Sequence, residues 1–329
     1  MERAAAGEPV AYSHGMTGTR LVSVGHYQPP RVVPNSELET MVDTSDEWIQ
    51  RRVGIRERRW AGPDETVDVM AERAARDVLA KGRTEADAVD LVIVATCSAV
   101  DRSPNMASRV AARLGMTRQP ATIDINTACS GFPHAVAIAQ HAIAAGASRT
   151  ALVIGSERLT DFTDFTDRTT CVLTADGAGA FLLTADPDEY VSPVLWGCVP
   201  DMGDAVRIEH AENDKFAQNG RAVFRWTTFE LPRIAREVLE RAKVPPEELA
   251  AIVLHQANLR IIEPLAAKIG AVNAVVATDV TESGNTSAAS IPLALSKMLE
   301  REPLPSGAPV LLFAFGGGLA YAGQVVRLP

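Results

Sequence analysis

Several features that would narrow the function of this chain at once are missing from its 329 residues. No stretch approaches the ~20 consecutive apolar residues of a membrane-spanning helix, so we expect no membrane contact. Lys and Arg form no basic stripe and the formal net charge is −9, so we expect no nucleic-acid partner. The first ten residues lack the apolar core of a signal peptide, and we expect residues 1–17 to form a flexible tail.

Cysteine is scarce as well. The chain has four cysteines, and none belongs to a C-x-x-C pair: Cys97, Cys129, Cys171 and Cys198. This spacing argues against a metal site and a disulfide framework, and it fits a reducing compartment, so we expect a cytoplasmic protein. The remaining composition, 47% hydrophobic and 22% charged, is that of a globular protein long enough for two domains or one duplicated fold.

Strand-like and helix-like segments alternate along the chain, which predicts an α/β fold. The runs 91–95 and 251–254 are almost wholly apolar, as in buried parallel strands. Two strand-to-glycine passages, 151–179 and 310–318, resemble each other and indicate an internal duplication. We therefore expect two halves, 18–183 and 184–329, with irregular loops over 184–227. We expect a capping box at 44–47 and helices over 67–80, 106–114, 132–145, 229–242, 258–269 and 288–300.

Cys129 stands between the strand-like run 122–126 and the helix that we expect from Phe132. Its neighbours Ala128, Ser130 and Gly131 are small and leave room for a substrate. At a helix N-terminus, unpaired N–H groups and the helix dipole favour a thiolate, so we predict a nucleophile with a lowered pKa. A buried structural cysteine is the alternative, and it is the better interpretation of the other three cysteines.

Two downstream segments carry possible partners for this thiol. His255 follows the apolar run 252–254, so we expect it at a strand's carboxyl end, where α/β proteins bind ligands. Asn285 lies in a turn of small residues that enters a helix, and its amide can cap that helix or face a substrate. Residues 316–318, all glycine, form either a tight turn or a backbone oxyanion donor. A thiol, an imidazole and an amide suit acyl transfer through a thioester.

These segments together resemble the β-ketoacyl-acyl-carrier-protein synthase III family. The resemblance rests on four ordered motifs, TACSGF at 127–132, HQANLRII at 255–262, GNTSAAS at 284–290 and FGGG at 315–318, and it spans roughly residues 18–329. It implies a homodimer with a thiolase-type fold, in which two similar α/β halves form five layers, α-β-α-β-α. It also implies decarboxylative condensation, in which Cys129 accepts an acyl group from acyl-CoA. Malonyl-acyl-carrier protein then loses carbon dioxide, and its enolate attacks the acyl-enzyme, with no cofactor because acyl-CoA is a substrate.

The resemblance also implies roles for individual residues. A neutral His255 and the Asn285 amide would donate hydrogen bonds to the malonyl thioester oxygen as enolate charge develops. The backbone N–H groups of Cys129 and Gly317 would hold the oxyanion of the tetrahedral intermediate. Two further sets are implied: Trp48, Arg52, Arg168 and Asn258 would bind CoA, and Arg260, Arg225 and Lys268 would dock the carrier protein.

Two departures bear on the substrate. Ser103 stands where relatives that use small starters can carry a bulky aromatic that closes the partner subunit's acyl pocket. Its small side chain predicts an acyl pocket that admits longer or branched groups. Residues 184–220 form a shorter region than in housekeeping relatives, which leaves both ordinary fatty acid synthesis and a specialised polyketide or lipid pathway open.

Related activities leave one serious alternative. A thiolase needs a second thiol near the C-terminus, and no cysteine follows Cys198. A hydroxymethylglutaryl-CoA synthase needs a glutamate base, and none stands upstream of Cys129 in a matching context. A non-catalytic partner subunit would lack the nucleophile, which is intact here. An acyltransferase that moves the acyl group from Cys129 to a hydroxyl or amine would use the same first step and remains open.

Overall fold

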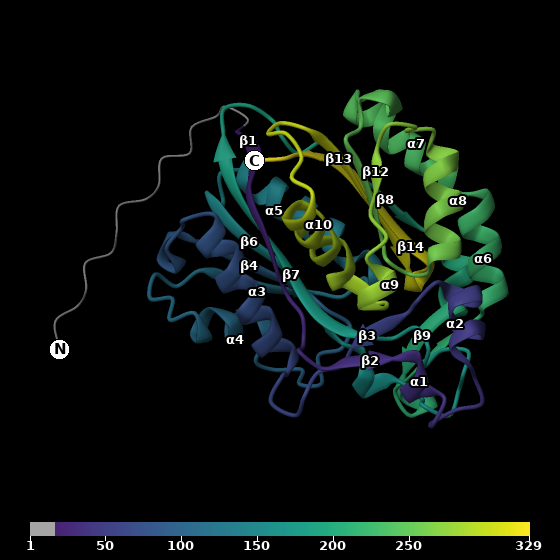
Figure 1. Ribbon diagram of the computed structural model, residues 1–329. Coiled ribbons are helices and arrows are strands. Elements are labelled where there is room, and N and C mark those ends of the chain that lie inside the picture. Colours follow the sequence, from purple (N-terminus) through teal and green to yellow (C-terminus); the bar gives the residue numbers. More distant parts are fainter. Residues whose placement is uncertain (1–16) are drawn as a thin grey trace, which may run out of the picture.

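The computed structural model describes residues 17–329, so nearly all of the expected N-terminal tail lies outside the described residues. Two five-stranded sheets stand face to face, with helices between them and on both outer sides (Figure 1). This arrangement confirms the α/β class that the sequence pattern predicts and the five layers that the resemblance implies. Within residues 17–329, no helix is long and apolar enough to cross a membrane.

The two sheets have the same topology. The first contains β1 (Gly18–Tyr27), β7 (Asp176–Asp186), β6 (Thr150–Arg158), β4 (Leu91–Ala95) and β5 (Ala121–Ile125), in that order. The second contains β12 (Val275–Val276), β11 (Ala251–Leu254), β13 (Pro309–Gly316), β14 (Ala320–Arg327) and β8 (Leu195–Cys198). Counted along the chain, the strands of the first sheet are β1, β4, β5, β6 and β7, and those of the second are β8, β11, β12, β13 and β14. In both sheets the second strand of this count lies between the third and the fourth and is parallel to both. The fifth strand lies between the fourth and the first and is antiparallel to both. This shared order supports the internal duplication.

The boundary that we predict between residues 183 and 184 falls within β7, which continues to Asp186. The first strand of the second sheet, β8, begins only at Leu195. The exact limits of the two halves therefore stay a prediction.

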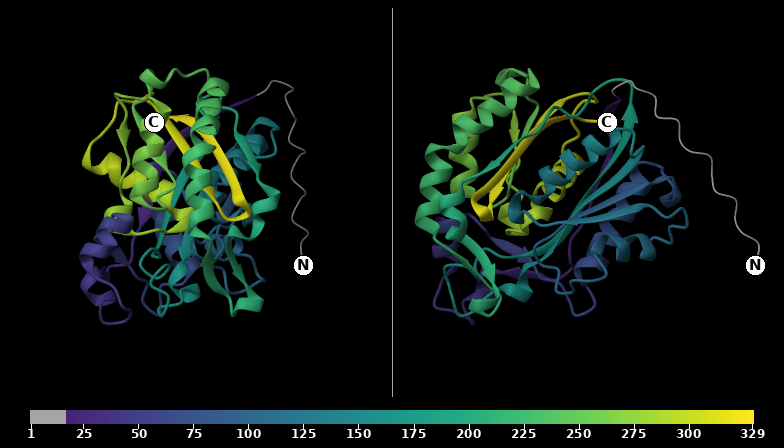
Figure 2. Two further views of the ribbon diagram at one scale, coloured as in Figure 1. Left: turned by 90° about the vertical axis from the view of Figure 1, so that its right-hand side faces the viewer. Right: turned by 180° about the vertical axis from the view of Figure 1, so that it is seen from behind.

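The middle layer consists of α5 (Gly131–Ala144) and α10 (Ser290–Arg301), which lie between the two sheets in both views of Figure 2. Their apolar side chains form one buried cluster with the inner faces of the sheets, including Phe132, Ile143, Ile291 and Leu295. A Cβ atom on Gly155 of β6 would lie 2.4 Å from the Ala288 carbonyl oxygen. Glycine therefore lets the turn before α10 contact the carboxyl end of β6.

The outer layers contain α3 (Val67–Lys81) and α4 (Met106–Arg113) on the first sheet, and α7 (Leu231–Ala242) and α8 (Leu259–Ile269) on the second. Apolar residues recur along one face of each helix, and this face packs on the sheet. The short elements are α1 (Asn35–Leu38), α2 (Asp46–Val53), α9 (Val280–Ser283) and the paired strands β2 (Val32–Pro34) and β3 (Glu57–Arg59).

The structure differs from the sequence prediction at two places. The helix that we expect over 229–242 is α7, which begins two residues later, at Leu231; a further helix that we did not predict, α6 (Gly220–Phe229), precedes it. Most of α6, and the hairpin of β9 (Val206–Glu209) and β10 (Lys215–Gln218), lie in the segment that we expect to be irregular. The cap of α2 is Ser45 rather than Thr44, and its hydroxyl oxygen accepts a hydrogen bond from the Trp48 N–H at 3.1 Å. The other predicted helices begin and end within two residues of their expected limits.

Candidate active site

The carboxyl ends of strands from both sheets bring three predicted residues to one cavity. Cys129 follows β5 on a single 3-10 turn, residues 128–130, that leads into α5. His255 directly follows β11, and Asn285 precedes the 3-10 turn before α10. All three side chains line a cavity of about 480 Å³ that reaches the surface beside Trp48. Segments more than a hundred residues apart thus form one site.

His255 is held in one orientation and is neutral. Its backbone N–H donates to the Phe313 carbonyl at 2.9 Å, and its ring packs edge-on against Phe315 with centroids 5.6 Å apart. Nδ1 lies 2.8 Å from Ser290 Oγ, which also accepts a hydrogen bond from the Gln256 N–H at 3.3 Å. This leaves the hydroxyl proton of Ser290 for Nδ1 and favours the tautomer with hydrogen on Nε2. Burial lowers the pKa of His255 to about 3, so the imidazole carries no charge at neutral pH.

The side-chain amide of Asn285 can cap the turn that follows it and still donate a hydrogen bond to a ligand. Its backbone pairs with residues 173–175, donating to the Leu173 carbonyl at 2.8 Å and accepting from the Ala175 N–H at 3.0 Å. Its Oδ1 accepts a hydrogen bond from the Ser287 N–H at 2.9 Å. The amide oxygen is thus used as a cap, while the NH₂ group stays available to a ligand in the cavity.

The protonation state of Cys129 is a correction to the sequence prediction. Burial raises the pKa of the thiol to about 11 instead of lowering it. Hydrogen bonds from the Ser287 hydroxyl and the Gly317 N–H lower the pKa, but the charge of Glu157 raises it further. The turn at the start of α5 therefore does not offset desolvation, and Cys129 is a thiol at neutral pH.

The glycines at 316–318 allow a close approach to the thiol. A Cβ atom on Gly316 would lie 2.5 Å from Cys129 Cβ and 2.9 Å from its Sγ. The backbone N–H of Gly317 hydrogen-bonds to Cys129 and lowers the pKa of its thiol. Position 316 must therefore be glycine, because any side chain there would overlap Cys129.

The outer part of the same cavity is lined by four residues that we predict from the resemblance: Trp48, Arg52, Asn258 and Arg260. Asn258 caps α8, with Oδ1 accepting from the Arg260 N–H at 2.9 Å, so its NH₂ group is left for a ligand. Arg168 is not part of the lining. Its guanidinium lies 5.2 Å from the Trp48 ring centroid, whereas an adenine between two planar groups needs roughly 7 Å. Arg168 must therefore move before a base can lie between the two side chains.

The remaining predicted residues lie outside the cavity linings. Arg225 on α6 and Lys268 on α8 are exposed, and Lys268 Nζ donates to the Thr228 carbonyl at 2.9 Å. Ser103 is exposed in the loop before α4 and borders neither cavity within its own chain. Its proposed place beside a partner subunit's acyl pocket stays a prediction.

A second cavity, of about 440 Å³, lies on the other side of Cys129 and Asn285. Its walls are largely apolar or small and include Cys97, Leu159, Ile208, Phe216 and Ala320. Cys129 and Asn285 thus line both cavities.

Sequence reasoning missed the residues that support the three central ones. Ser290 and Phe315 orient His255, Ser287 contacts Cys129, and Glu157 is buried behind them. The rule that found His255 could have found Glu157, because it too stands at the carboxyl end of a predicted buried strand.

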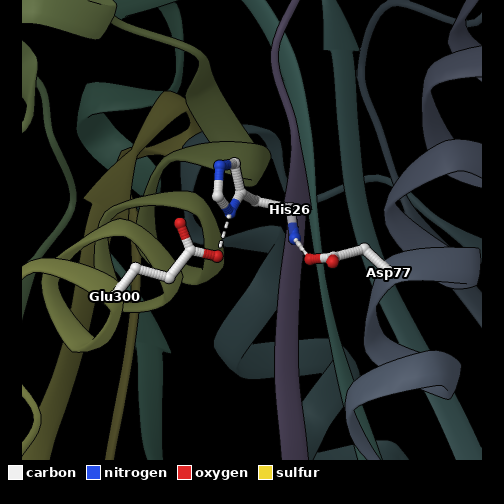
Figure 3. Close-up of side chains that lie close together, drawn as sticks. All are labelled: His26, Asp77 and Glu300. Atoms are coloured by element: carbon white, nitrogen blue, oxygen red, sulfur yellow. Dashed lines mark hydrogen bonds and ion pairs between the residues drawn. The ribbon is translucent and has the colours of Figure 1, made fainter.

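One titratable cluster lies away from the cavities. Figure 3 shows His26 of β1 between Asp77 of α3 and Glu300 of α10, with candidate ligand atoms within 4.8 Å of one another. Lys81 Nζ already lies 2.7 Å from Asp77 and 2.6 Å from Glu300. A metal ion would have to displace this ammonium group, so we interpret the cluster as an ion-pair network that joins the two helix layers.

Comparison with protein families gives two matches. A model described as 3-oxoacyl-[acyl-carrier-protein (ACP)] synthase III matches residues 123–197, and its C-terminal counterpart matches residues 239–328. The first match contains Cys129, and the second contains His255 and Asn285.

Individual proteins are similar over nearly the whole chain. Beta-ketoacyl-[acyl-carrier-protein] synthase III 2 of Streptomyces avermitilis is 60% identical over 317 residues, which cover 95% of this chain and 100% of that protein. Synthase III 4 of Streptomyces coelicolor is 61% identical, with 95% and 99% covered. The solved priming β-ketosynthase of the R1128 polyketide pathway is 36% identical, with a TM-score of 0.93 over 98% of this chain and 99% of that one. The 3-oxoacyl-[acyl-carrier-protein] synthase III of Aquifex aeolicus is 38% identical, with a TM-score of 0.90 over 94% and 100%.

Proposed function

Because this chain belongs to the 3-oxoacyl-[acyl-carrier-protein] synthase III family, we propose how its own residues carry out the family's reaction. The enzyme is an acyltransferase that joins an acyl-CoA starter to malonyl-acyl-carrier protein with loss of carbon dioxide, which initiates fatty acid or polyketide synthesis. The observation that carries the assignment of roles is the meeting of Cys129, His255 and Asn285 in one cavity.

In the first half-reaction, Cys129 Sγ attacks the acyl-CoA carbonyl carbon. The backbone N–H groups of Cys129 and Gly317 stabilise the oxyanion, and CoA leaves as its thiol. The close contact between Gly316 and the thiol supports this geometry, because it removes any side chain from the path of the acyl group. The acyl chain then occupies the second cavity.

In the second half-reaction, His255 and Asn285 act as hydrogen-bond donors and transfer no proton. Neutral His255 donates from Nε2, and Asn285 donates from its NH₂ group, to the malonyl thioester oxygen. Both bonds strengthen as decarboxylation places negative charge on that oxygen. A donor that is neutral and buried is suited to this task because it needs no solvent reorganisation. The enolate carbon attacks the acyl carbonyl carbon, the bond from that carbon to Cys129 Sγ breaks, the sulfur takes up a proton, and the β-ketoacyl product leaves on the carrier protein.

The substrates approach through the outer cavity. Trp48 and Arg52 border the adenine end of CoA, Arg168 moves to stack on the base, and the Asn258 amide donates to the pantetheine arm. The exposed cations Arg260, Arg225 and Lys268 attract the acidic carrier protein. We expect Arg260→Glu to slow turnover with malonyl-acyl-carrier protein but to leave acylation by acyl-CoA unchanged. Arg149→Glu is the matched charge control, because Arg149 is an exposed arginine that directly precedes β6 and lines neither cavity.

We further propose that the reaction requires neither cofactor nor metal.

We also propose a homodimer formed through the first sheet. β5 is the last strand of its sheet, and its central residue Ile123 is 39% exposed. An unpaired edge with an exposed apolar residue is suited to pairing with a second copy. In such a dimer Ser103 would reach the partner's acyl chamber.

The test is the mass of the intact protein after incubation with short, branched and long acyl-CoAs, without and with malonyl-acyl-carrier protein. We expect an acyl adduct on the wild type and none on Cys129→Ala, followed by a β-ketoacyl-carrier product. An adduct that persists with malonyl-acyl-carrier protein but is lost to a hydroxyl or amine acceptor would instead identify the acyltransferase alternative. No adduct with any acyl-CoA would contradict the assignment of Cys129.

A further inference from the structure

The two donors of the second half-reaction come from different segments of the chain. His255 follows β11, whereas Asn285 follows α9 and Gly284. Two hydrogen bonds that converge on one oxygen require their donors to keep a fixed separation, and a displacement of about 1 Å can cost about 10²-fold in rate. A contact that holds the end of β11 against the start of α9 would therefore control decarboxylation.

The side chain of Gln256 makes this contact. Gln256 is buried directly after His255, and its Oε1 accepts a hydrogen bond at 3.0 Å from the N–H of Val280, the first residue of α9. Its Nε2 donates to the Leu254 carbonyl at 2.8 Å and to the Ala277 carbonyl at 3.1 Å. One amide thus joins the end of β11, the segment after β12 and the start of α9.

The position suits glutamine in particular. Both N–H donors of its amide and the amide oxygen are used inside buried protein, and a fully satisfied polar network holds its members in one arrangement. The Ala257 N–H also donates to the His255 carbonyl at 2.8 Å, which closes a three-residue turn around Gln256. Methionine would fill a similar space but would lose all three side-chain hydrogen bonds. Gln256 therefore couples the position of His255 to that of α9.

The start of α9 depends on Gln256 because the residue at its own cap position is used elsewhere. Asp279 makes no capping hydrogen bond, and its Oδ1 lies 2.6 Å from Lys297 Nζ of α10. In many helices a side chain at this position accepts a hydrogen bond from the first turn. Here the acceptor comes instead from the segment that carries His255, so that segment positions the helix that leads to Asn285.

The far end of α9 is held without Gln256. Lys297 Nζ donates to Ser283 Oγ at 2.8 Å, and the Asn285 N–H donates to the Leu173 carbonyl at 2.8 Å. A substitution of Gln256 should therefore shift the start of α9 against β11 but leave the helix attached. Cys129 belongs to the other half of the molecule and should keep its place.

We propose that Gln256 is a positioning residue that sets the separation of His255 and Asn285 for decarboxylation. This inference rests on the proposed function, in which both side chains donate to the malonyl thioester oxygen. Gln256 lines neither cavity, so it acts through the two donors and not by touching substrate. Acylation uses the backbone N–H groups of Cys129 and Gly317 and should not depend on Gln256.

The first experiment times the two half-reactions separately for wild type, Gln256→Met and Gln140→Met. Acylation is followed by intact mass, and each acyl-enzyme, freed of acyl-CoA, is then mixed with saturating malonyl-acyl-carrier protein while carbon dioxide is measured. Gln256→Met should acylate like wild type but release carbon dioxide about 10²-fold more slowly. Gln140→Met is the matched control, because it removes a buried amide hydrogen bond, to the Val191 carbonyl at 2.6 Å, near the far end of α5. Both of its half-reactions should match wild type.

The second experiment measures both half-reactions against pH for Gln256→Glu, whose side chain has nearly the same shape. A protonated carboxyl group keeps an acceptor for the Val280 N–H and one O–H donor, whereas a carboxylate faces two carbonyl oxygens without a donor. Asp279 is already paired with Lys297, and His255 is neutral, so the new carboxyl group gains no cation and burial raises its pKa. Its ordered, protonated form is therefore lost as pH rises.

We expect carbon dioxide release by Gln256→Glu to be nearest to wild type at about pH 5 and to decline toward the rate of Gln256→Met at about pH 9. Acylation of the same variant should follow the wild-type pH profile, which a general loss of structure would not allow.

Three results would overturn the inference: wild-type carbon dioxide release by Gln256→Met, an equal loss in both of its half-reactions, or a decarboxylation pH profile of Gln256→Glu parallel to that of wild type. If Gln256→Met does not fold, the two pH profiles of Gln256→Glu decide the matter. Failure of wild type to form an adduct, or a wild-type adduct that never releases carbon dioxide, would overturn the proposed function itself.

Discussion

At the scale of single residues, burial sets the protonation of the site. The same desolvation raises the pKa of Cys129 to about 11 and lowers that of His255 to about 3. The imidazole therefore acts as a neutral donor, and its tautomer depends on Ser290. His255 and Ser290 can be tested separately.

The first prediction concerns the pH dependence of decarboxylation. Because the pKa of His255 is lowered, the ring is neutral at all pH values well above 3, and its protonation begins only as pH falls toward 3. We expect carbon dioxide release from malonyl-acyl-carrier protein by a preformed acyl-enzyme to be independent of pH between about 5 and 8. A decline centred near pH 6.5 would mean that the imidazole is solvated and titrates normally.

The second prediction concerns Ser290. Replacing Ser290 by Ala removes the hydroxyl beside His255 Nδ1, so the ring hydrogen is no longer directed to Nε2. We expect decarboxylation to slow about tenfold, equivalent to ~1.4 kcal/mol, while acylation of Cys129 is unaffected. Ser296→Ala on the same helix is the matched control, because that buried hydroxyl faces His26 rather than the site. Equal effects of the two substitutions would argue against the tautomer role.

At the scale of helices, strands and turns, the site depends on where backbone segments end. Hydrophobic periodicity predicted β4 and β11 to the residue and most helices within two residues, because these elements bury one regular face. It missed α6 and the β9–β10 hairpin, whose residues are half exposed over the cavity and follow no simple period. Cys129, His255 and Asn285 could be found because each stands at such an end. The roles of Ser287 and Ser290 depend on contacts between distant segments, which no local pattern records.

The third prediction concerns Gly316. An added Cβ would clash with Cys129 Cβ and Sγ, so Gly316→Ala must shift the thiol or the donor at Gly317. We expect acylation to fall by at least about 10²-fold, the cost of losing one oxyanion donor. Gly203→Ala is the control, since the nearest atom to its Cβ is 4.0 Å away. Wild-type acylation in Gly316→Ala would show that the thiol does not react in this position.

At the scale of the whole molecule, duplication explains the position of the site. Two sheets of equal topology pack around α5 and α10, so their strand ends and helix starts meet once, at the cavity between the halves. One half supplies the nucleophile and the other supplies the two donors. The periodic apolar segments and repeated glycines predicted an α/β fold with an internal duplication, and the family resemblance implied the five layers, but the sequence alone did not reveal which side chains pack across the middle layer.

The fourth prediction concerns assembly. If β5 pairs with its copy, the sedimentation mass is twice 35.1 kDa, and Ile123→Lys yields a monomer because it places an ammonium group at the strand pairing. Val272→Lys, on a highly exposed valine elsewhere, is the control and should remain dimeric. A monomeric wild type at micromolar concentration would contradict the proposed dimer.

The most direct test of the account follows both half-reactions in one experiment. Wild type and His255→Ala are acylated on Cys129, freed of acyl-CoA and mixed with malonyl-acyl-carrier protein, and carbon dioxide, residual adduct and carrier product are measured together. We predict that wild type loses its adduct as carbon dioxide and the β-ketoacyl product form in equal amounts, while His255→Ala keeps its adduct and releases almost no carbon dioxide. Loss of the wild-type adduct without carbon dioxide, or equal condensation by His255→Ala, would contradict the assignment of the site as a decarboxylating one.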